Sequence, residues 1–107
     1  MAAIYYQRGE SLDYTNSSGS EIKAGDVIIL EDRIGVASCD MADGAKGAVE
    51  VVGVFEFTKT GSSAIAMGQN VYFDGIGITN ASSSNTPAGF AAAAAGASDT
   101  KILVKIG

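Results

Sequence analysis

Few residues of this 107-residue chain could do chemistry, because it contains no histidine and a single cysteine. Catalysis and metal binding through an imidazole are therefore excluded. Cys39 stands between Ser38 and Asp40, but consecutive residues of a strand point to opposite faces, so these three cannot act together as a nucleophilic site. We expect Cys39 to be a small core residue. A single cysteine also forms no intrachain disulfide.

The remaining polar motifs are typical of turns and strands rather than of a site. The segment Gly44–Gly47 resembles a phosphate-binding loop in composition alone, since no lysine follows a glycine and precedes Ser or Thr. Asp40 and Asp43 indicate an ordinary polar turn and match no calcium-binding loop. Glu50 and Glu56, placed on one strand, lie roughly 20 Å apart, too far for the carboxylate pair of a glycosidase. The sequence predicts no catalytic residue, no metal site and no cofactor.

The charges argue against two classes of partner. Twelve acidic and seven basic residues give a net charge of −5, and the basic residues are scattered along the chain. Binding to nucleic acid or to an anionic membrane needs clustered Lys and Arg, so we expect neither partner. The first ten residues lack the features of a signal peptide, and no stretch of about 18 apolar residues could span a bilayer. We expect the chain to be made and kept in a cytosol-like compartment, or carried out of the cell in an assembly.

Glycines separate short segments rich in Val, Ile, Tyr and Phe, a pattern typical of strands joined by turns. Asp43-Gly44 and Asp74-Gly75 are tight-turn dipeptides. Inside the expected strand over residues 49–58, Gly53 suggests a bulge or the close approach of another backbone. The clearest strands are expected over four ranges, residues 12–15, 27–30, 49–58 and 101–106.

One segment, residues 62–67, predicts a short helix that ends at Gly68. The alanine run 91–95 is compatible with a strand or a helix. Glycines bracket it closely and an isolated helix so short is marginal, so a small-residue strand is favoured. The predicted fold is all-β: a small β-barrel or sandwich with at most one short helical turn.

A weak repeat links the two halves of the chain. Residues 23–29 (KAGDVII) lead to Gly35-Val36-Ala37, and residues 66–73 (AMGQNVYF) lead to Gly89-Phe90-Ala91. Both read as a turn, a strand and a connection, followed by glycine, an apolar residue and alanine. Two similar β units that form one small barrel would produce this pattern, and so would chance in a glycine-rich β chain.

The composition predicts a thin core. Hydrophobic residues make up 47% of the chain, but seventeen of them are alanine. A domain of this size buries about two-thirds of the surface of its unfolded chain, so burial shared with other subunits would help. Charged residues, at 18%, fall below the roughly 25% of an average domain, which indicates that part of the surface is covered.

Over nearly its full length the chain resembles the family of small bacteriophage and prophage proteins called capsid cement, or head decoration, proteins. Each matching segment is a common turn or strand phrase, and the resemblance rests on their order and spacing. It implies a β-rich domain that binds the outside of an assembled icosahedral shell, often as an oligomer, and it implies no catalytic residue. The matching segments are Gly9–Thr15, Ala24–Ile28, Ile34–Ala37, Gly53–Phe57 with Lys59, Ile65–Asp74 and Gly89–Ala91.

The function predicted is that of a capsid cement protein, which binds the outer surface of a phage head and stabilises the shell without catalysis. Its expected partners are the major capsid protein and further copies of itself, with a homotrimer favoured. Its expected place is the virion exterior, after synthesis in the bacterial host cytoplasm. An N-terminal arm, residues 1–8, is expected to precede a single β domain, residues 9–107. Contacts outside the subunit are expected at Ile4, Tyr5, Tyr6, Arg8, Phe90, Ala91 and Ala93.

The alternative is a carbohydrate- or receptor-binding β module. Tyr5, Tyr6, Tyr14 and Tyr72 could form a platform on which sugar rings stack, together with the polar loop at 80–86. Buried or interfacial tyrosines are more common than such platforms, so the cement function is preferred.

Overall fold

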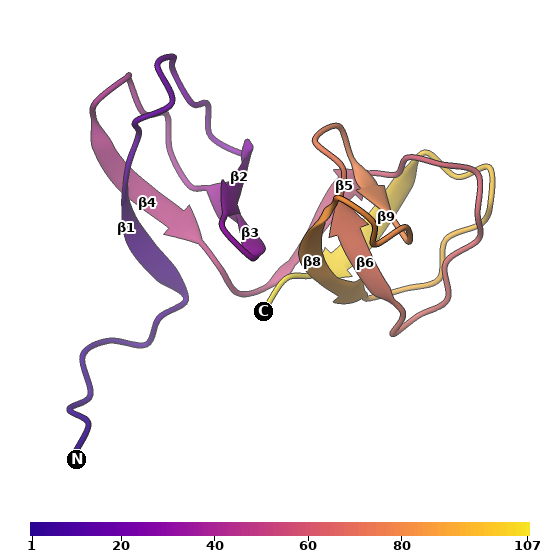
Figure 1. Cartoon of the computed structure of the whole chain (residues 1–107), viewed down its shortest axis with the longest axis horizontal. Helices are drawn as coiled ribbons and strands as arrows, with labels where there is room; N and C mark the ends of the chain where they lie inside the picture. The colour runs from indigo at the N-terminus through magenta and orange to yellow at the C-terminus, as the bar shows by residue number, and fades with distance from the viewer.

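Short apolar segments between turns form nine strands and no helix (Figure 1). The computed structural model describes all of residues 1–107. One sheet has the strand order β1-β4-β3-β2, and it contains β1 (Ser11–Thr15), β2 (Val27–Leu30), β3 (Arg33–Ala37) and β4 (Lys46–Glu50). The other has the order β5-β9-β8-β6-β7, and it contains β5 (Val54–Thr58), β6 (Asn70–Phe73), β7 (Ile78–Thr79), β8 (Thr86–Ala91) and β9 (Lys101–Lys105).

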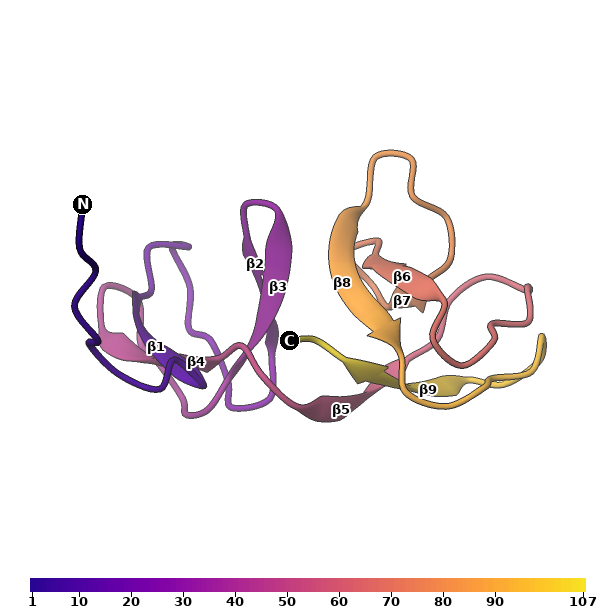
Figure 2. The same ribbon diagram turned by 90° about the horizontal axis from the view of Figure 1, so that it is seen from below.

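Both sheets are antiparallel, and neither closes into a barrel. The all-β prediction is confirmed, in its sandwich-like form. We call residues 10–50 the N-terminal unit and residues 53–107 the C-terminal unit. Figures 1 and 2 show the two units side by side, with the C-terminus between them. Residues 1–8 lie outside both sheets.

The predicted strand over residues 49–58 is two strands that belong to different sheets. β4 ends at Glu50 and β5 begins at Val54. Between them Gly53 has a φ of 128°, a backbone conformation that glycine adopts readily. Gly53 therefore marks the junction between the units, where the sequence pattern suggested a bulge. Alternation of apolar residues is a local signal, and it does not reveal that the pairing partner changes at this point.

The repeat in the sequence corresponds to a repeat in strand order, although the two units do not form one barrel. Strands β1, β2, β3 and β4 correspond to β5, β6, β8 and β9, because both sheets place these strands in the same order. Each unit is therefore a four-stranded Greek key, with a meander of three strands and a fourth strand beside its end. The C-terminal unit adds β7 at one edge.

Backbone hydrogen bonds repeat along with the strands. The N–H of Gly25 donates to the carbonyl of Ala37 over 2.8 Å, and the N–H of Gly68 donates to that of Ala91 over 2.7 Å. Outside the strands, an antiparallel bridge in each unit holds the loop that precedes the second strand. Such matched contacts argue against a chance similarity between the units. The bridges join Ile22 to Met41 and Ile65 to Ala95.

No helix forms at residues 62–67, where one was predicted. Ile65 instead pairs with Ala95, and Gly68, with a φ of 87°, turns the chain into β6. The alanine run is neither a continuous strand nor a helix: Ala91 ends β8, and the chain then turns before Ala95 reaches its bridge. Long-range pairing with a backbone outweighs the helix propensity of alanine here.

An insertion distinguishes the two units. The N-terminal unit joins β2 to β3 by the turn Glu31-Asp32, whereas the C-terminal unit joins β6 to β8 through residues 74–85, which include β7. Ile78 of β7 is completely buried and forms one parallel bridge with Lys59, just after β5. This bridge curls the second sheet over its core without closing it.

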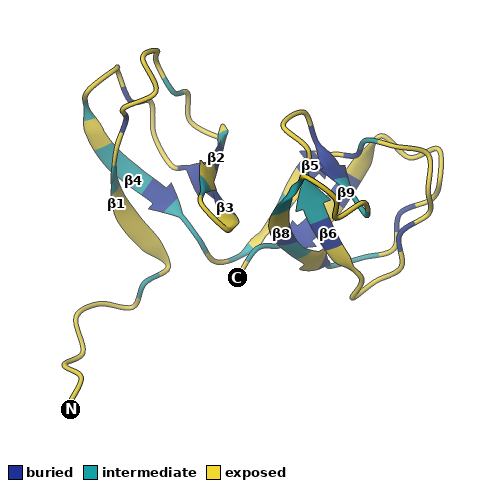
Figure 3. Ribbon diagram, viewed as in Figure 1, coloured by how far each residue is buried: buried dark blue, intermediate teal, exposed yellow.

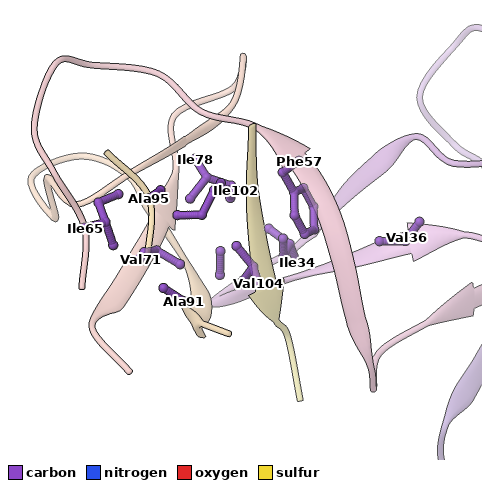
Figure 4. Close-up of a cluster of buried hydrophobic side chains, with 11 residues drawn as sticks. Ile34, Val36, Phe57, Ile65, Val71, Ile78, Ala91, Ala95, Ile102 and Val104 are labelled. Atoms are coloured by element: carbon purple, nitrogen blue, oxygen red, sulfur yellow. The ribbon is translucent and has the colours of Figure 1, made fainter. Parts of the chain in front are cut away.

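The hydrophobic core is uneven. The N-terminal unit has four buried apolar residues of its own, namely Ile28, Ala37, Met41 and Val49. The larger cluster, drawn in Figure 4, lies in the C-terminal unit and also receives Ile34 and Val36 from β3. Because Ala37 and Val36 alternate along the strand, β3 buries one face in its own unit and the other in its neighbour. The burial colours of Figure 3 show the consequence: β1 is largely exposed, whereas β8 and β9 carry buried residues.

Candidate contact surfaces

The carboxylates singled out in the sequence form turns rather than a reactive centre. Asp40 accepts a hydrogen bond from the N–H of Ala24 over 2.8 Å, and Asp43 accepts one from the N–H of Gly19 over 3.1 Å. Glu50 and Glu56 lie in different sheets. No three acidic or cysteine side chains gather as a metal-binding group.

Cys39 is exposed, which corrects the prediction that it is a core residue. It follows the end of β3, where alternation no longer decides which side of the sheet a side chain faces. No helix of the structure is long and apolar enough to cross a membrane.

The N-terminal arm, residues 1–8, is exposed along its whole length. Ile4, Tyr5 and Tyr6 are each at least 78% exposed, and Arg8 pairs with Glu10 over 3.3 Å at the surface. The exposed apolar side chains of the arm would gain free energy from burial against a partner, because neither sheet of the chain buries them. Four residues predicted as contacts therefore lie together on one exposed segment.

Phe90 lies on the outer face of the C-terminal unit, away from its core. Across the sheet it stands beside Lys105 of β9, which stands beside Val54 of β5. Leu103, on the same face, is the next outward residue of β9. Phe90, Val54 and Leu103 are all exposed, so this face presents apolar side chains beside Lys101, Lys105 and Glu56. The alternation of β9 contained this signal, because Leu103 shares a face with Lys101 and Lys105.

Ala91 and Ala93 do not share that face. Ala91 is completely buried in the core of the C-terminal unit, so its side chain presents no surface to a partner. Ala93 follows the end of β8 and is half-buried. The structure thus places the predicted contact residues in four places: the arm, the outer face, the core and, for Ala93, the segment after β8.

A second apolar surface lies on the N-terminal unit, where the sequence indicated none. Leu12 of β1 is 40% exposed, and Tyr14 and Leu30 are half-buried beside the small core. In the C-terminal unit the corresponding positions are Phe55, Phe57 and Phe73. We call the surface of Leu12, Tyr14 and Leu30 the open face, because no segment of the chain covers it as β3 covers its counterpart.

A cleft of about 640 Å³ separates the two units. Val27 and Val36 of the N-terminal unit line one side, and Phe55, Phe57 and Phe73 line the other. The cleft is therefore the incompletely filled contact between β2 and β3 and the C-terminal unit, and Asp26, Glu56 and Lys101 also line it.

The negative charge belongs to one unit. Nine of the twelve acidic residues lie in residues 10–50, with three of the seven basic ones, whereas the C-terminal unit carries three of each. One result is that Lys23 pairs with Glu21 over 3.0 Å, and the hydrogen bond and charge of Glu21, with Asp40 nearby, raise the pKa of Lys23. The two units therefore offer different electrostatic surfaces.

The four tyrosines do not form a platform for sugar rings. Tyr5 and Tyr6 lie on the arm, Tyr14 on β1 and Tyr72 on β6 in the other sheet. The carbohydrate-binding alternative therefore has no assembled site in its favour.

The geometry describes a molecule with two exposed apolar sheet faces and an apolar arm. Residues 6–106 match the family described as phage cement protein. The chain belongs to this family. The match covers both units and the end of the arm from Tyr6, whereas Ile4 and Tyr5 lie before it. No curated protein and no solved structure gives a significant match to this cement protein.

Proposed function

We propose that this cement protein binds the outer surface of an assembled phage head and stabilises the shell, without catalysis. The observation that carries the proposal is the arm: an exposed apolar segment, on a member of the cement family, that its own chain leaves without a partner. The major capsid protein is the proposed partner of the arm, and residues 9–107 act as the domain that the arm anchors.

The proposed mechanism is thermodynamic linkage. A protein that binds the assembled shell and not its dissociated subunits lowers the free energy of the shell but not that of the subunits, so the shell becomes more stable. At a free concentration 100 times its Kd, each bound copy stabilises its site by about 2.7 kcal/mol. Self-association, with a trimer favoured, would multiply this effect, because one anchored copy holds its neighbours near their own sites.

The proposed location is the virion exterior, after synthesis in the host cytoplasm. The net charge of −5 supports the exterior, because an acidic surface is repelled by the DNA that fills the head. The same charge argues against nucleic acid as a partner.

Co-sedimentation with purified shells tests the proposal. We expect the wild-type protein to pellet with shells and to raise their melting temperature. The variant Ile4→Ser/Tyr5→Ser/Tyr6→Ser should weaken binding at least tenfold, since about 1.4 kcal/mol of lost apolar burial suffices. Met67→Ser, which removes an exposed apolar side chain from a turn, is the matched control and should bind as the wild type does. No binding and no shift in shell melting would refute the cement function.

A further inference from the structure

The repeat shows how one unit of this chain covers another. Within the chain, the outer face of β2 and β3 in the N-terminal unit packs against the C-terminal unit. Val27 and Val36, which are paired across these strands, face Phe55, Phe57 and Phe73. This contact has a covering side and a receiving side, and each has a counterpart in the other unit.

The counterpart of the covering side is exposed. Asn70 and Phe90, which are paired across β6 and β8, correspond to Val27 and Val36. Val36 is 6% exposed, because it packs on the C-terminal unit, whereas Phe90 is 39% exposed. The outer face of the C-terminal unit thus corresponds to the covering side of the contact, but it covers no other unit of its own chain.

The counterpart of the receiving side is exposed as well. It is the open face of Leu12, Tyr14 and Leu30, which correspond to Phe55, Phe57 and Phe73. Leu12 is 40% exposed, whereas Phe55 is half-buried against the larger core cluster, to which Ile34 and Val36 of β3 belong. Within residues 1–107 no second sheet covers this face, so it is available to a partner.

We propose that copies of this cement protein associate head to tail, with the outer face of one C-terminal unit covering the open face of the next N-terminal unit. The contact continues the one that already joins the two units of each chain. Charge favours it too: on the covering face Lys101 and Lys105 outnumber the single carboxylate of Glu56 beside Leu103. On the acidic unit Glu31 and Asp32 follow Leu30.

The two contacts differ in one detail. Ile34, which enters the C-terminal core, corresponds to Ala88, and a register shift in the pairing of β6 with β8 turns Ala88 into its own core. The covering face of the C-terminal unit therefore lacks a large residue at that point. Val54 and Leu103 supply exposed apolar area on the same face instead.

A head-to-tail contact uses two different surfaces, so it forms a ring when the rotation between copies closes. The trimer of the proposed function would then place six similar units around one axis. The placement of this ring on a shell rests on the proposed function, whereas the contact between copies is tested on the free protein.

Light scattering after size-exclusion chromatography provides the first test. The wild-type protein should have the mass of a closed oligomer, whereas Leu12→Asp and Phe90→Asp should each reduce association at least tenfold. Met67→Asp, an exposed apolar position outside both faces, should keep the wild-type mass. A monomeric wild type, or oligomeric Leu12→Asp and Phe90→Asp variants, would overturn the proposal. Circular dichroism identifies any variant that fails to fold.

Mixing the variants separates this contact from a two-fold symmetric one. Leu12→Asp retains an intact covering face and Phe90→Asp retains an intact open face, so an equal mixture should form dimers, and no larger species. A mixture that stays monomeric contradicts a head-to-tail contact.

Cross-linking needs no disruption of the interface and covers the case of misfolded variants. In a Cys39→Ser background, Leu12→Cys mixed with Phe90→Cys should give disulfide-linked dimers on mild oxidation, and each alone should give few. Efficient linking of Leu12→Cys to itself would show a symmetric contact instead.

Oligomers formed through the arm would be lost in Ile4→Ser/Tyr5→Ser/Tyr6→Ser and kept in Phe90→Asp, and this result would also overturn the proposal. Shell binding by a protein without the head-to-tail contact refutes this inference and leaves the proposed function intact.

Discussion

Two buried polar side chains, Asn16 and Lys59, occupy corresponding positions, each directly after the first strand of its unit. The amide nitrogen of Asn16 donates to three carbonyls, including that of Met41 over 3.0 Å. The ammonium group of Lys59 reaches the carbonyl of Ala97 over 3.4 Å. Both side chains tie the end of the first strand to the turn before the last strand. A buried donor is retained in both units because the backbone acceptors of that turn need a partner.

A second pair of corresponding residues, Gly35 and Gly89, allows strands to approach closely. A Cβ atom on Gly35 would meet a side chain of β4, and one on Gly89 would meet the carbonyl oxygen of Lys105. Gly89 also has a φ of 120°. The repeated Gly-apolar-Ala phrase in the sequence therefore has a physical basis, since these two positions have no room for a side chain.

We predict that Gly89→Ala destabilises the fold by about 2–4 kcal/mol, because it adds a backbone clash to an unfavourable φ. Gly19→Ala is the matched control: its φ of 88° is also positive, but nothing lies within 4 Å of the added Cβ, so the cost should be about 1 kcal/mol. Urea unfolding measures both values. Equal losses would show that the close approach to β9 contributes nothing.

Among the elements, β7 and the turn before it account for the difference between the two units. Asp74 accepts hydrogen bonds from the N–H groups of Ile76 and Gly77 and from the hydroxyl of Thr60. These bonds hold the turn that brings Ile78 over the core, and they favour the charged carboxylate. The bond from Gly77, followed by that from Thr60, lowers the pKa of Asp74 below its ordinary value of 3.8.

A lowered pKa in the folded state predicts the direction of a pH effect. The stabilisation by Asp74 is fully present above about pH 5 and is lost as the pH falls through 3.8 towards the folded pKa. We expect Asp74→Asn to lose stability at pH 7, by less than about 1 kcal/mol because the side chain is largely exposed, and to match the wild type near pH 2. Thermal melting across this range measures the difference. A difference between Asp74→Asn and the wild type that stays the same from pH 7 to pH 2 would contradict the prediction.

At the scale of the whole molecule, the two units share one core through β3. The N-terminal unit has four buried apolar residues of its own, whereas the larger cluster has eleven. Ile34 and Val36 join it to the larger cluster of the C-terminal unit. The acidic unit is thus stabilised by its neighbour on one side and exposes an apolar face on the other, as a protein that works by contact requires.

We predict that Ile34→Ala costs about 2–4 kcal/mol and separates the unfolding of the two units. Calorimetry should show one transition for the wild type and an earlier additional one for the variant. Ile28→Ala, which removes the same side chain from the small core of the N-terminal unit, is the control. If both variants melt in a single transition, the units are not coupled through Ile34.

The amino-acid sequence by itself determined the local features of this protein. β2 and β9 lie where alternation and turn residues predicted them, and the repeat was visible in a few residues around Gly25 and Gly68. The lack of histidine and of any phosphate-binding or metal-binding motif pointed to a protein without a catalytic site. Such features depend on residues within one strand or turn, and neighbouring side chains decide them.

The tertiary structure alone decided which residues meet. The division of residues 49–58 between two sheets, the bridge in place of a helix before Gly68 and the exposure of Cys39 all depend on partners far away in sequence. The exposure of the open face also depends on the tertiary structure. Leu12 and its counterpart Phe55 are both apolar in the sequence, but the structure covers Phe55 and leaves Leu12 exposed. Alternation tells which residues share a face, but long-range pairing decides what covers that face.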